Sequence, residues 1–226
     1  MSLMAKKLIG VAVAVAVVGA VIGFYIADYL LAYPATFAAS TAKAASTGAG
    51  SAQLTLASVP GAGDSTPHPT WVSFFAIDAH GGWHHTTIYK VPAHSLVRVT
   101  IYNYDGASGL RNPFISEAQG VVGSTFMLNG KPTVSINPDD ASHVFAIAQL
   151  GVSVPLPGVP ATAKNPCAAA PCSLSQDHET ISFTFRTGKP GRFRWQCLVP
   201  CAAGFILGFG GPMATTGYMD GFVQVV

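Results

Sequence analysis

The sequence predicts a mainly β fold: a single transmembrane helix followed by a Greek-key β-sandwich. Two patterns predict this class, namely one long apolar run near the N-terminus and, after it, short segments of alternating apolar and polar residues separated by turn residues. The composition agrees, because half of the 226 residues are hydrophobic and only 10% are charged, against about 25% in ordinary globular chains. The net charge of +2 offers no strong field for collecting nucleic acid, so no nucleic-acid partner is expected.

The first element is the apolar run Leu8–Leu31, in which Asp28 is the one charged residue. At 1.5 Å per residue, a helix of this length crosses about 30 Å of hydrocarbon. Lys6 and Lys7 precede the run, so the positive-inside rule places the N-terminus in the cytoplasm and the C-terminal domain outside the cell membrane. We therefore assign residues 1–33 to a single-pass anchor. A cleaved secretory signal is the alternative interpretation.

Two further regions follow the anchor. Residues 34–70 are rich in Ala, Ser and Gly without periodicity and are predicted to form a linker. Residues 71–226 are assigned to an outer domain, interrupted by insertions at 103–131 and 155–178. The alternation and turn residues predict its strands at Trp71–Asp78, Thr86–Val91, Leu96–Tyr102, Thr133–Asn137, His143–Ile147, Thr180–Arg186, Arg192–Cys197 and Met219–Val226.

All four cysteines lie in the region predicted to be outside the membrane. Cys167 and Cys172 stand in a Pro-rich insertion and are predicted to form a local disulfide in an oxidising compartment. Cys197 and Cys201 follow a predicted strand and are separated by three residues. Two thiolates at this spacing can bind a soft metal such as copper, and a second short disulfide is the other interpretation.

Three segments of the outer domain resemble subunit II of the haem-copper respiratory oxidases, whose outer domain is a cupredoxin. They are His143-Val-Phe-Ala-Ile-Ala-Gln-Leu-Gly-Val with the later Pro157-Gly158, then Lys189-Pro-Gly-Arg-Phe-Arg-Trp-Gln-Cys197-Leu-Val-Pro-Cys201, and finally Met219-Asp-Gly-Phe-Val-Gln-Val-Val. Their order and the preceding membrane helix are similar to the family's organisation. The resemblance implies a cupredoxin-like sandwich.

The family's dinuclear copper centre, CuA, is bound by two cysteines, two histidines, one methionine and one backbone carbonyl. By resemblance, the corresponding ligands are His143, Cys197, the carbonyl of Val199, Cys201 and Met219. The ligand set is incomplete, because Phe205 occupies the position of the second histidine. The groups that could replace it are Met213, His80, His84, His85, His94 and His178. Otherwise the domain is copper-free, and its last two cysteines form a disulfide or remain thiols.

The resemblance implies a subunit II-like component of a terminal oxidase, either a cytochrome c or a quinol oxidase, in aerobic respiratory electron transport. Its partners would be the polytopic haem-copper oxidase subunit I, which would hold the haem, other membrane subunits, and a quinol or a small electron-donor protein. With an incomplete copper centre, the chain would have a structural and donor-docking role and no activity alone. The alternatives are a free-standing, membrane-anchored copper electron-transfer protein and a copper-free structural module.

The outer region contains only two glutamates, Glu117 and Glu179. A domain with few carboxylates has few groups whose protonation changes its stability as the pH falls, so we expect it to face an acidic exterior. The free energy of unfolding, measured by urea titration, should change less between pH 7 and pH 3 than that of a homologue from a neutral environment. An equal loss in both proteins would contradict this expectation.

Overall fold

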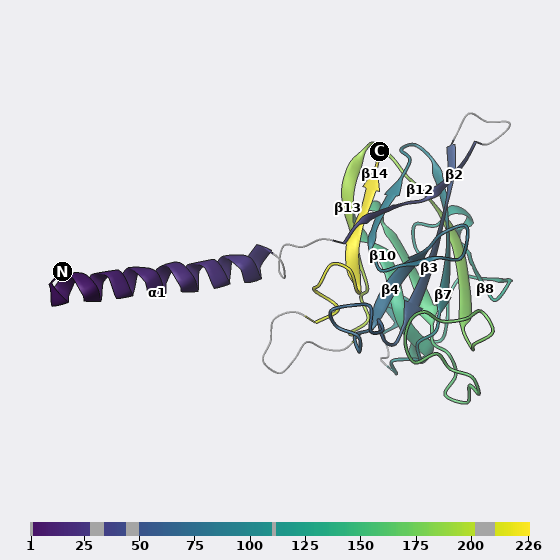
Figure 1. Cartoon of the computed structure of the whole chain (residues 1–226). Coiled ribbons are helices and arrows are strands. Elements are labelled where there is room, and N and C mark those ends of the chain that lie inside the picture. The colour runs from purple at the N-terminus through teal and green to yellow at the C-terminus, as the bar shows by residue number, and fades with distance from the viewer. Residues whose placement is uncertain (1, 28–33, 44–49, 110–111, 202–210) are drawn as a thin grey trace. The chain divides into compact units, whose positions relative to one another are not determined.

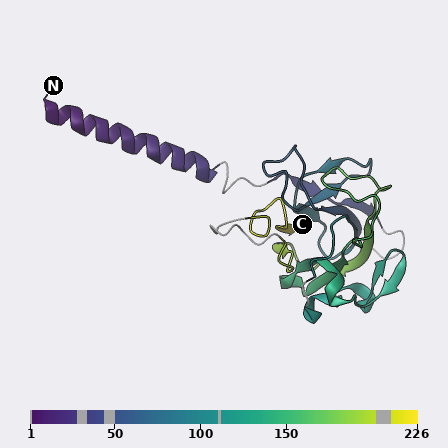
Figure 2. The ribbon, with the colours of Figure 1, turned by 90° about the horizontal axis from the view of Figure 1, so that it is seen from below.

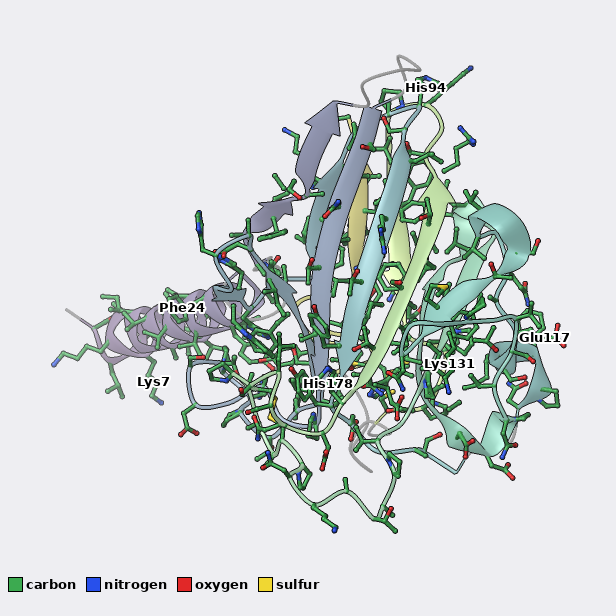
Figure 3. The ribbon with its side chains drawn as sticks, turned by 90° about the vertical axis from the view of Figure 1, so that its right-hand side faces the viewer. Lys7, Phe24, His94, Glu117, Lys131 and His178 are labelled. Atoms are coloured by element: carbon green, nitrogen blue, oxygen red, sulfur yellow. A yellow bond between two sulfur atoms is a disulfide. The ribbon has the colours of Figure 1, made fainter. Side chains whose placement is uncertain are left out.

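The computed structural model describes residues 2–27, 34–43, 50–109, 112–201 and 211–226, and the chain divides into two units, Met1–Tyr33 and Pro34–Val226 (Figure 1). In the first unit, helix α1 spans Leu3–Tyr25, and its side chains are exposed, as Lys7 and Phe24 show in Figure 3. With 23 residues, it is long and apolar enough to cross a membrane, which is compatible with a single-pass anchor. Asp28 lies outside the described residues.

The second unit consists of two β-sheets (Figures 1 and 2). The six-stranded sheet has the order β1 (Thr36–Ala38), β6 (Ile88–Val91), β14 (Asp220–Val225), β13 (Gly191–Gln196), β10 (Ala141–Ile147) and β11 (Val152–Pro157). The other has the order β5 (Trp83–His84), β4 (Ser73–Ile77), β3 (Gly50–Val59), β7 (Leu96–Asn103), β12 (Glu179–Arg186), β8 (Phe126–Leu128) and β9 (Lys131–Thr133), with β2 (Ser40–Lys43) paired to β3. The prediction of a mainly β sandwich after one apolar helix is confirmed.

Alternating side chains explain the strands that the sequence predicts best. In β7, Val97, Val99 and Ile101 are fully buried, whereas Arg98 between them is exposed. Its antiparallel neighbour β12 buries Ile181, which is paired with Ile101 across the ladder. Because side chains alternate between the two faces of a strand, this pattern turns one apolar face of the sheet toward the core.

The core lies between the two sheets and is rich in aromatic rings. Phe74 of the eight-stranded sheet meets Trp195 of the six-stranded sheet edge-on, with ring centroids 4.9 Å apart. Phe145 stacks on Trp195 at 5.0 Å, and the indole Nε1 donates a hydrogen bond to the carbonyl of Thr87 at 2.8 Å. The buried indole thus has a partner for its polar atom, as such groups require.

The predicted linker at residues 34–70 is wrong, because the structure builds β1, β2 and β3 from this segment. β3 lies inside its sheet, parallel to β7 and antiparallel to β4. Leu54 and Leu56 of β3 are at most 1% exposed. Gln53 before these leucines is exposed, whereas Ala57, Ser58 and Val59 after them are buried. The small Ala, Ser and Thr residues of this strand resemble a linker, so composition alone was misleading.

Other strand boundaries also differ from the prediction. The strand predicted at Thr133–Asn137 is wrong: β9 ends at Thr133, and a 3-10 turn, η4 (Pro138–Asp140), precedes β10. The predicted insertions contain β8 and the last residues of β11, which pair with β12 and β10. In the described part of the chain, the other 3-10 helices are η2 (Pro113–Ser116), η3 (Val122–Ser124) and η5 (Ala148–Leu150). In the second insertion, the predicted disulfide between Cys167 and Cys172 is confirmed.

The place of β3 in the sheet can be tested by substitution. Leu56→Ala should lower the free energy of unfolding by about 2–5 kcal/mol, because it removes a fully buried side chain and leaves a cavity. The matched control is Val122→Ala at a side chain that is 46% exposed, where a change within about 0.5 kcal/mol is expected. Urea titration, monitored by tryptophan fluorescence, measures the free energy of unfolding of both variants. Equal, near-zero effects would restore the linker interpretation.

Candidate metal centre

The pairing of β10 with β13 brings the predicted ligands together. The two strands are antiparallel neighbours with Ala146 opposite Gln196. His143 lies in β10 beside a register shift, and Cys197 follows β13 directly. The backbone N–H of Cys197 donates to the carbonyl of Met219 at 3.0 Å, which fixes the end of β13 against the start of the last strand.

Three donor atoms converge in this region. His143 Nδ1 lies 2.8 Å from Cys201 Sγ and 3.9 Å from Cys197 Sγ, and the two sulfurs are 3.3 Å apart. The carbonyl oxygen of Val199 lies 3.1 Å from Cys201 Sγ and 3.5 Å from Cys197 Sγ. All four residues are buried. The structure therefore brings together four of the five ligands that the resemblance implies.

The sulfurs are not joined, so the alternative of a second disulfide is wrong for this structure. A disulfide requires a sulfur separation of about 2.05 Å, whereas the observed separation is 3.3 Å. The backbone N–H of Val144 points at Cys197 Sγ at 3.4 Å. Such a contact stabilises negative charge on a sulfur and is typical of a thiolate that serves as a ligand.

The sequence analysis missed Asp105, which holds the far side of the imidazole. Its Oδ2 lies 3.1 Å from His143 Nε2. A carboxylate in this position orients the ring and leaves Nδ1 directed at the sulfurs, as in the carboxylate–histidine pairs that support metal ligands. No spacing signal could have found it, because Asp105 comes 38 residues before His143 in a loop after β7.

Asn103 at the end of β7 fixes this loop. Its side chain is fully buried and donates to the carbonyl of Pro157 at 2.8 Å, and its Oδ1 accepts from the N–H of Asp105 at 3.3 Å. The N–H of Val159 donates to the carbonyl of Asp105 at 2.9 Å. The carboxylate is thus positioned by the ends of two strands, β7 and β11.

The charges of the site are coupled. Burial lowers the pKa of His143, but its hydrogen bonds with Asp105 and Cys197 outweigh burial and raise the pKa to about 9. Burial raises the pKa of the Cys197 thiol, yet hydrogen bonds from Cys201 and His143 bring it below its usual range. The pKa of Cys201 is raised, first by its hydrogen bond to Cys197 and then by burial. These directions favour negative charge on Cys197, a protonated Cys201 and a protonated His143.

The donor set fits a soft metal ion. Thiolate sulfur and imidazole nitrogen are the ligands that copper(I) and zinc prefer, and His143, Cys197 and Cys201 place their donor atoms within 4.8 Å of one another. No second histidine belongs to this group in the described part of the chain. The position of Phe205 lies outside the described residues, and Met219, fully buried in the same core, stays a predicted ligand.

The other histidines have different surroundings, so their proposed replacement of the missing ligand is not supported. His84 pairs with Asp78 at 2.8 Å. His85 packs between the rings of Phe75 and Tyr218. The backbone N–H of His80 donates to the carboxylate of Asp78, and the backbone N–H of His94 donates to the carbonyl of Gly188. The ring of His178 packs against Tyr102 and Tyr104. Met213 packs at the edge of the core.

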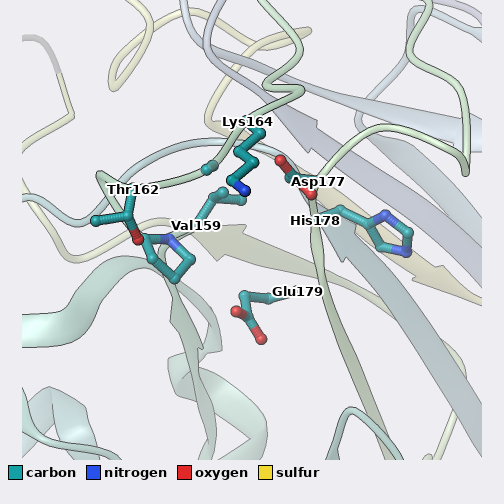
Figure 4. A pocket seen from close by; sticks show the side chains of 8 residues that line it. Val159, Thr162, Lys164, Asp177, His178 and Glu179 are labelled. Carbon is teal, nitrogen blue, oxygen red and sulfur yellow. The ribbon is translucent and has the colours of Figure 1, made fainter.

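A separate hollow of about 310 Å³ is lined by charged side chains (Figure 4). Lys164, Asp177, His178 and Glu179 surround it. Hard carboxylate and ammonium groups do not suit a soft metal. The candidate soft-metal site is therefore the thiolate–imidazole group and not this hollow.

The fold and the site together define a mainly β sandwich with a buried thiolate–imidazole donor group. No family model and no curated protein matches the chain. Solved structures similar to it include rusticyanin from Thiobacillus ferrooxidans, 16% identical over 84% of this chain and 82% of that chain, with a TM-score of 0.34. Another is a multicopper oxidase, 15% identical over 78% of this chain and 44% of that chain, also with a TM-score of 0.34.

The role of Asp105 can be tested through metal affinity. Asp105→Ala should weaken copper(I) binding about 10–100-fold, because the imidazole loses the partner that orients it. Asp105→Asn keeps an oxygen that accepts a hydrogen bond from Nε2, so its copper(I) affinity should lie between those of Asp105→Ala and the wild type. Competition with a coloured copper(I) chelator measures affinity, and imidazole ¹⁵N shifts report the state of each ring nitrogen.

The control for these variants is Asp64→Asn, at an exposed carboxylate that does not line the site. An unchanged copper(I) affinity in Asp105→Ala, together with unchanged ¹⁵N shifts of His143, would contradict the positioning role of Asp105.

Proposed function

We propose that the chain is a membrane-anchored, cupredoxin-like copper protein that carries single electrons. The observation that carries this proposal is the convergence of His143 Nδ1 with the sulfurs of Cys197 and Cys201 inside a buried site. A bound copper would supply a one-electron couple, tuned by soft sulfur and imidazole ligands. The chain's own residues hold the donors and exclude water.

Burial and strand pairing suit this role. Cys197 is 1% exposed and His143 is 2% exposed, and each is attached to a strand of the same sheet. A site on strands is positioned more precisely than one on loops. Small movement of the donors between two oxidation states is the requirement for rapid electron transfer, and a close-packed core resists such movement.

The more specific proposal is a subunit II-like role in a terminal oxidase. It is supported by the order of His143, the Cys197–Cys201 pair and Met219 along the chain, and by the apolar helix that precedes them. The partners would then be a haem-bearing polytopic subunit I and a quinol or small electron-donor protein. The domain would lie on the outer side of the cell membrane. A free-standing electron carrier is the competing role.

The proposal predicts copper binding by the purified full-length chain. We expect one or two copper ions per chain by elemental analysis, with sulfur-to-copper absorption bands in the visible or near-infrared range. Cys197→Ser and His143→Ala should abolish these bands, because each removes one donor of the group. The matched control is the double variant Cys167→Ser/Cys172→Ser, which removes two sulfurs outside the site and should leave the bands in place.

Several outcomes separate the roles. A chain without copper after loading under reducing conditions would contradict the electron-transfer proposal and leave a structural module. Two coppers per chain would indicate a dinuclear centre. Co-purification with a haem-bearing membrane partner supports the oxidase role, whereas isolation as a single copper-loaded chain supports the free-standing carrier.

A further inference from the structure

One end of the sandwich is closed by two short connections that contact each other. Residues 92–95 join β6 to β7, and residues 187–190 join β12 to β13. The backbone N–H of His94 in the first connection donates to the carbonyl of Gly188 in the second at 3.0 Å. Figure 3 shows His94 at this end of the domain. The two sheets are therefore linked here, and the side chains around the connections belong to one surface.

This surface is strongly basic. Five exposed cations lie on it or at the strand ends beside it: Lys90, Arg98, Arg186, Lys189 and Arg192. We call these five residues the basic end. The segments that form it, residues 90–98, 184–194 and 222–226, contain no Asp or Glu, and their one negative group is the carboxylate of the last residue. A further cation, Arg194, is paired with Asp220 at 2.7 Å and is not counted.

Strand register aligns two of these cations on one face of the six-stranded sheet. Lys90 of β6 lies opposite Gln224 of β14, which lies opposite Arg192 of β13. Because neighbouring strands are about 4.8 Å apart, the Cα atoms of Lys90 and Arg192 are about 10 Å apart. The guanidinium of Arg192 lies over the ring of Phe222, 3.6 Å from its centroid. A row of this kind can contact several neighbouring anionic groups at once.

The opposite end of the domain has the opposite charge. The carboxylates that line its hollows are Asp105, Asp140, Asp177 and Glu179. Lys164 is the one lysine or arginine among the residues that line these hollows. Two strands connect the ends: β7 carries Arg98 near its start and is followed by Asp105, and β12 runs from Glu179 to Arg186. The domain thus has a basic end and an acidic end, and such a charge distribution orients it in an external field.

The covalent chain limits how far the basic end can be from a membrane in which α1 is anchored. About ten residues separate Ile26, at the end of α1, from Thr36, at the start of β1, and an extended chain of this length spans at most about 36 Å. β1 is the neighbour of β6, with Ala38 opposite Lys90. Lipid headgroups are therefore the anionic groups that this chain keeps within reach of its own cations.

We propose that the basic end binds the anionic lipid headgroups of the membrane in which the chain is anchored. Lysine and arginine side chains near an anionic membrane surface are attracted to it, whereas the carboxylates of the acidic end are repelled. His143 and the cysteine pair, which lie toward the acidic end, then face the aqueous phase and a partner in solution. The proposal rests on the membrane anchor of the proposed function and not on copper.

The first test compares two lipid surfaces. The metal-free, full-length chain is placed in nanodiscs of phosphatidylcholine or of phosphatidylcholine mixed with phosphatidylglycerol, and its lysines are acetylated with an uncharged N-hydroxysuccinimide ester and quantified by peptide mass spectrometry. Lys90 and Lys189 should react at least about threefold more slowly in the anionic nanodiscs. Lys131 and Lys164, exposed lysines outside the basic end, are internal controls and should react equally in both. Salt at about 1 M, where the Debye length is about 3 Å, should remove the difference.

The second test reverses charges and keeps the two reporting lysines. Arg98→Glu/Arg186→Glu should remove at least about half of the protection of Lys90 and Lys189 in anionic nanodiscs, because two of the five cations become anions. The matched control, Lys131→Glu/Lys164→Glu, changes the net charge by the same amount outside the basic end and should keep the protection. Circular dichroism confirms that both variants are folded.

The outcomes separate this proposal from copper binding. Equal labelling of Lys90 and Lys189 in the two kinds of nanodisc would overturn it and leave an acidic protein surface as the class of partner. Equal protection in the two folded double variants would overturn it as well. A chain that shows the expected protection but binds no copper would contradict the electron-transfer proposal and retain this one. A chain that does not stay in either nanodisc would contradict the membrane anchor, and with it this proposal.

Discussion

The hydrogen bond between His143 Nε2 and Asp105 turns the other ring nitrogen toward Cys197 and Cys201. A buried imidazole next to two buried sulfurs is stable only when the charges of the group compensate one another. Here the carboxylate of Asp105, the imidazole of His143, whose pKa is raised, and the sulfur of Cys197, whose pKa is lowered, lie in a row with alternating charge. The geometry of the donors therefore depends on a residue that is itself not a donor.

The rest of the fold keeps this row of groups in place. Asn103 holds the loop of Asp105 against the end of β11, and the N–H of Cys197 donates to the carbonyl of Met219, just before β14. All residues of β10 are buried; several of them belong to the core, and η2 contacts the strand. The site thus draws on both sheets, although its donors come from one.

Alternation predicted β7 and β12, each of which has one more exposed face, whereas β10 was predicted although it is buried throughout. β7 and β12 alternate because Arg98 and its equivalents meet solvent while Val97 and Ile181 meet the core. β3 was missed because its small Ala, Ser and Thr residues resemble a linker in composition, although Gln53 is exposed while Leu54 and Leu56 are buried. The low fraction of charged residues was consistent both with a linker and with a buried strand in this segment.

Residue type and spacing along the chain were enough to determine three features. These are the apolar helix, the short loop closed by the Cys167–Cys172 disulfide, and His143, Cys197 and Cys201 as candidate donors. Sequence alone left open whether the second cysteine pair forms a disulfide or remains two thiols beside a histidine. Only the tertiary structure decided this, and only it added Asp105 to the site. The physical reason is that these contacts join segments far apart along the chain, and their distances depend on strand register and packing, which no local pattern encodes.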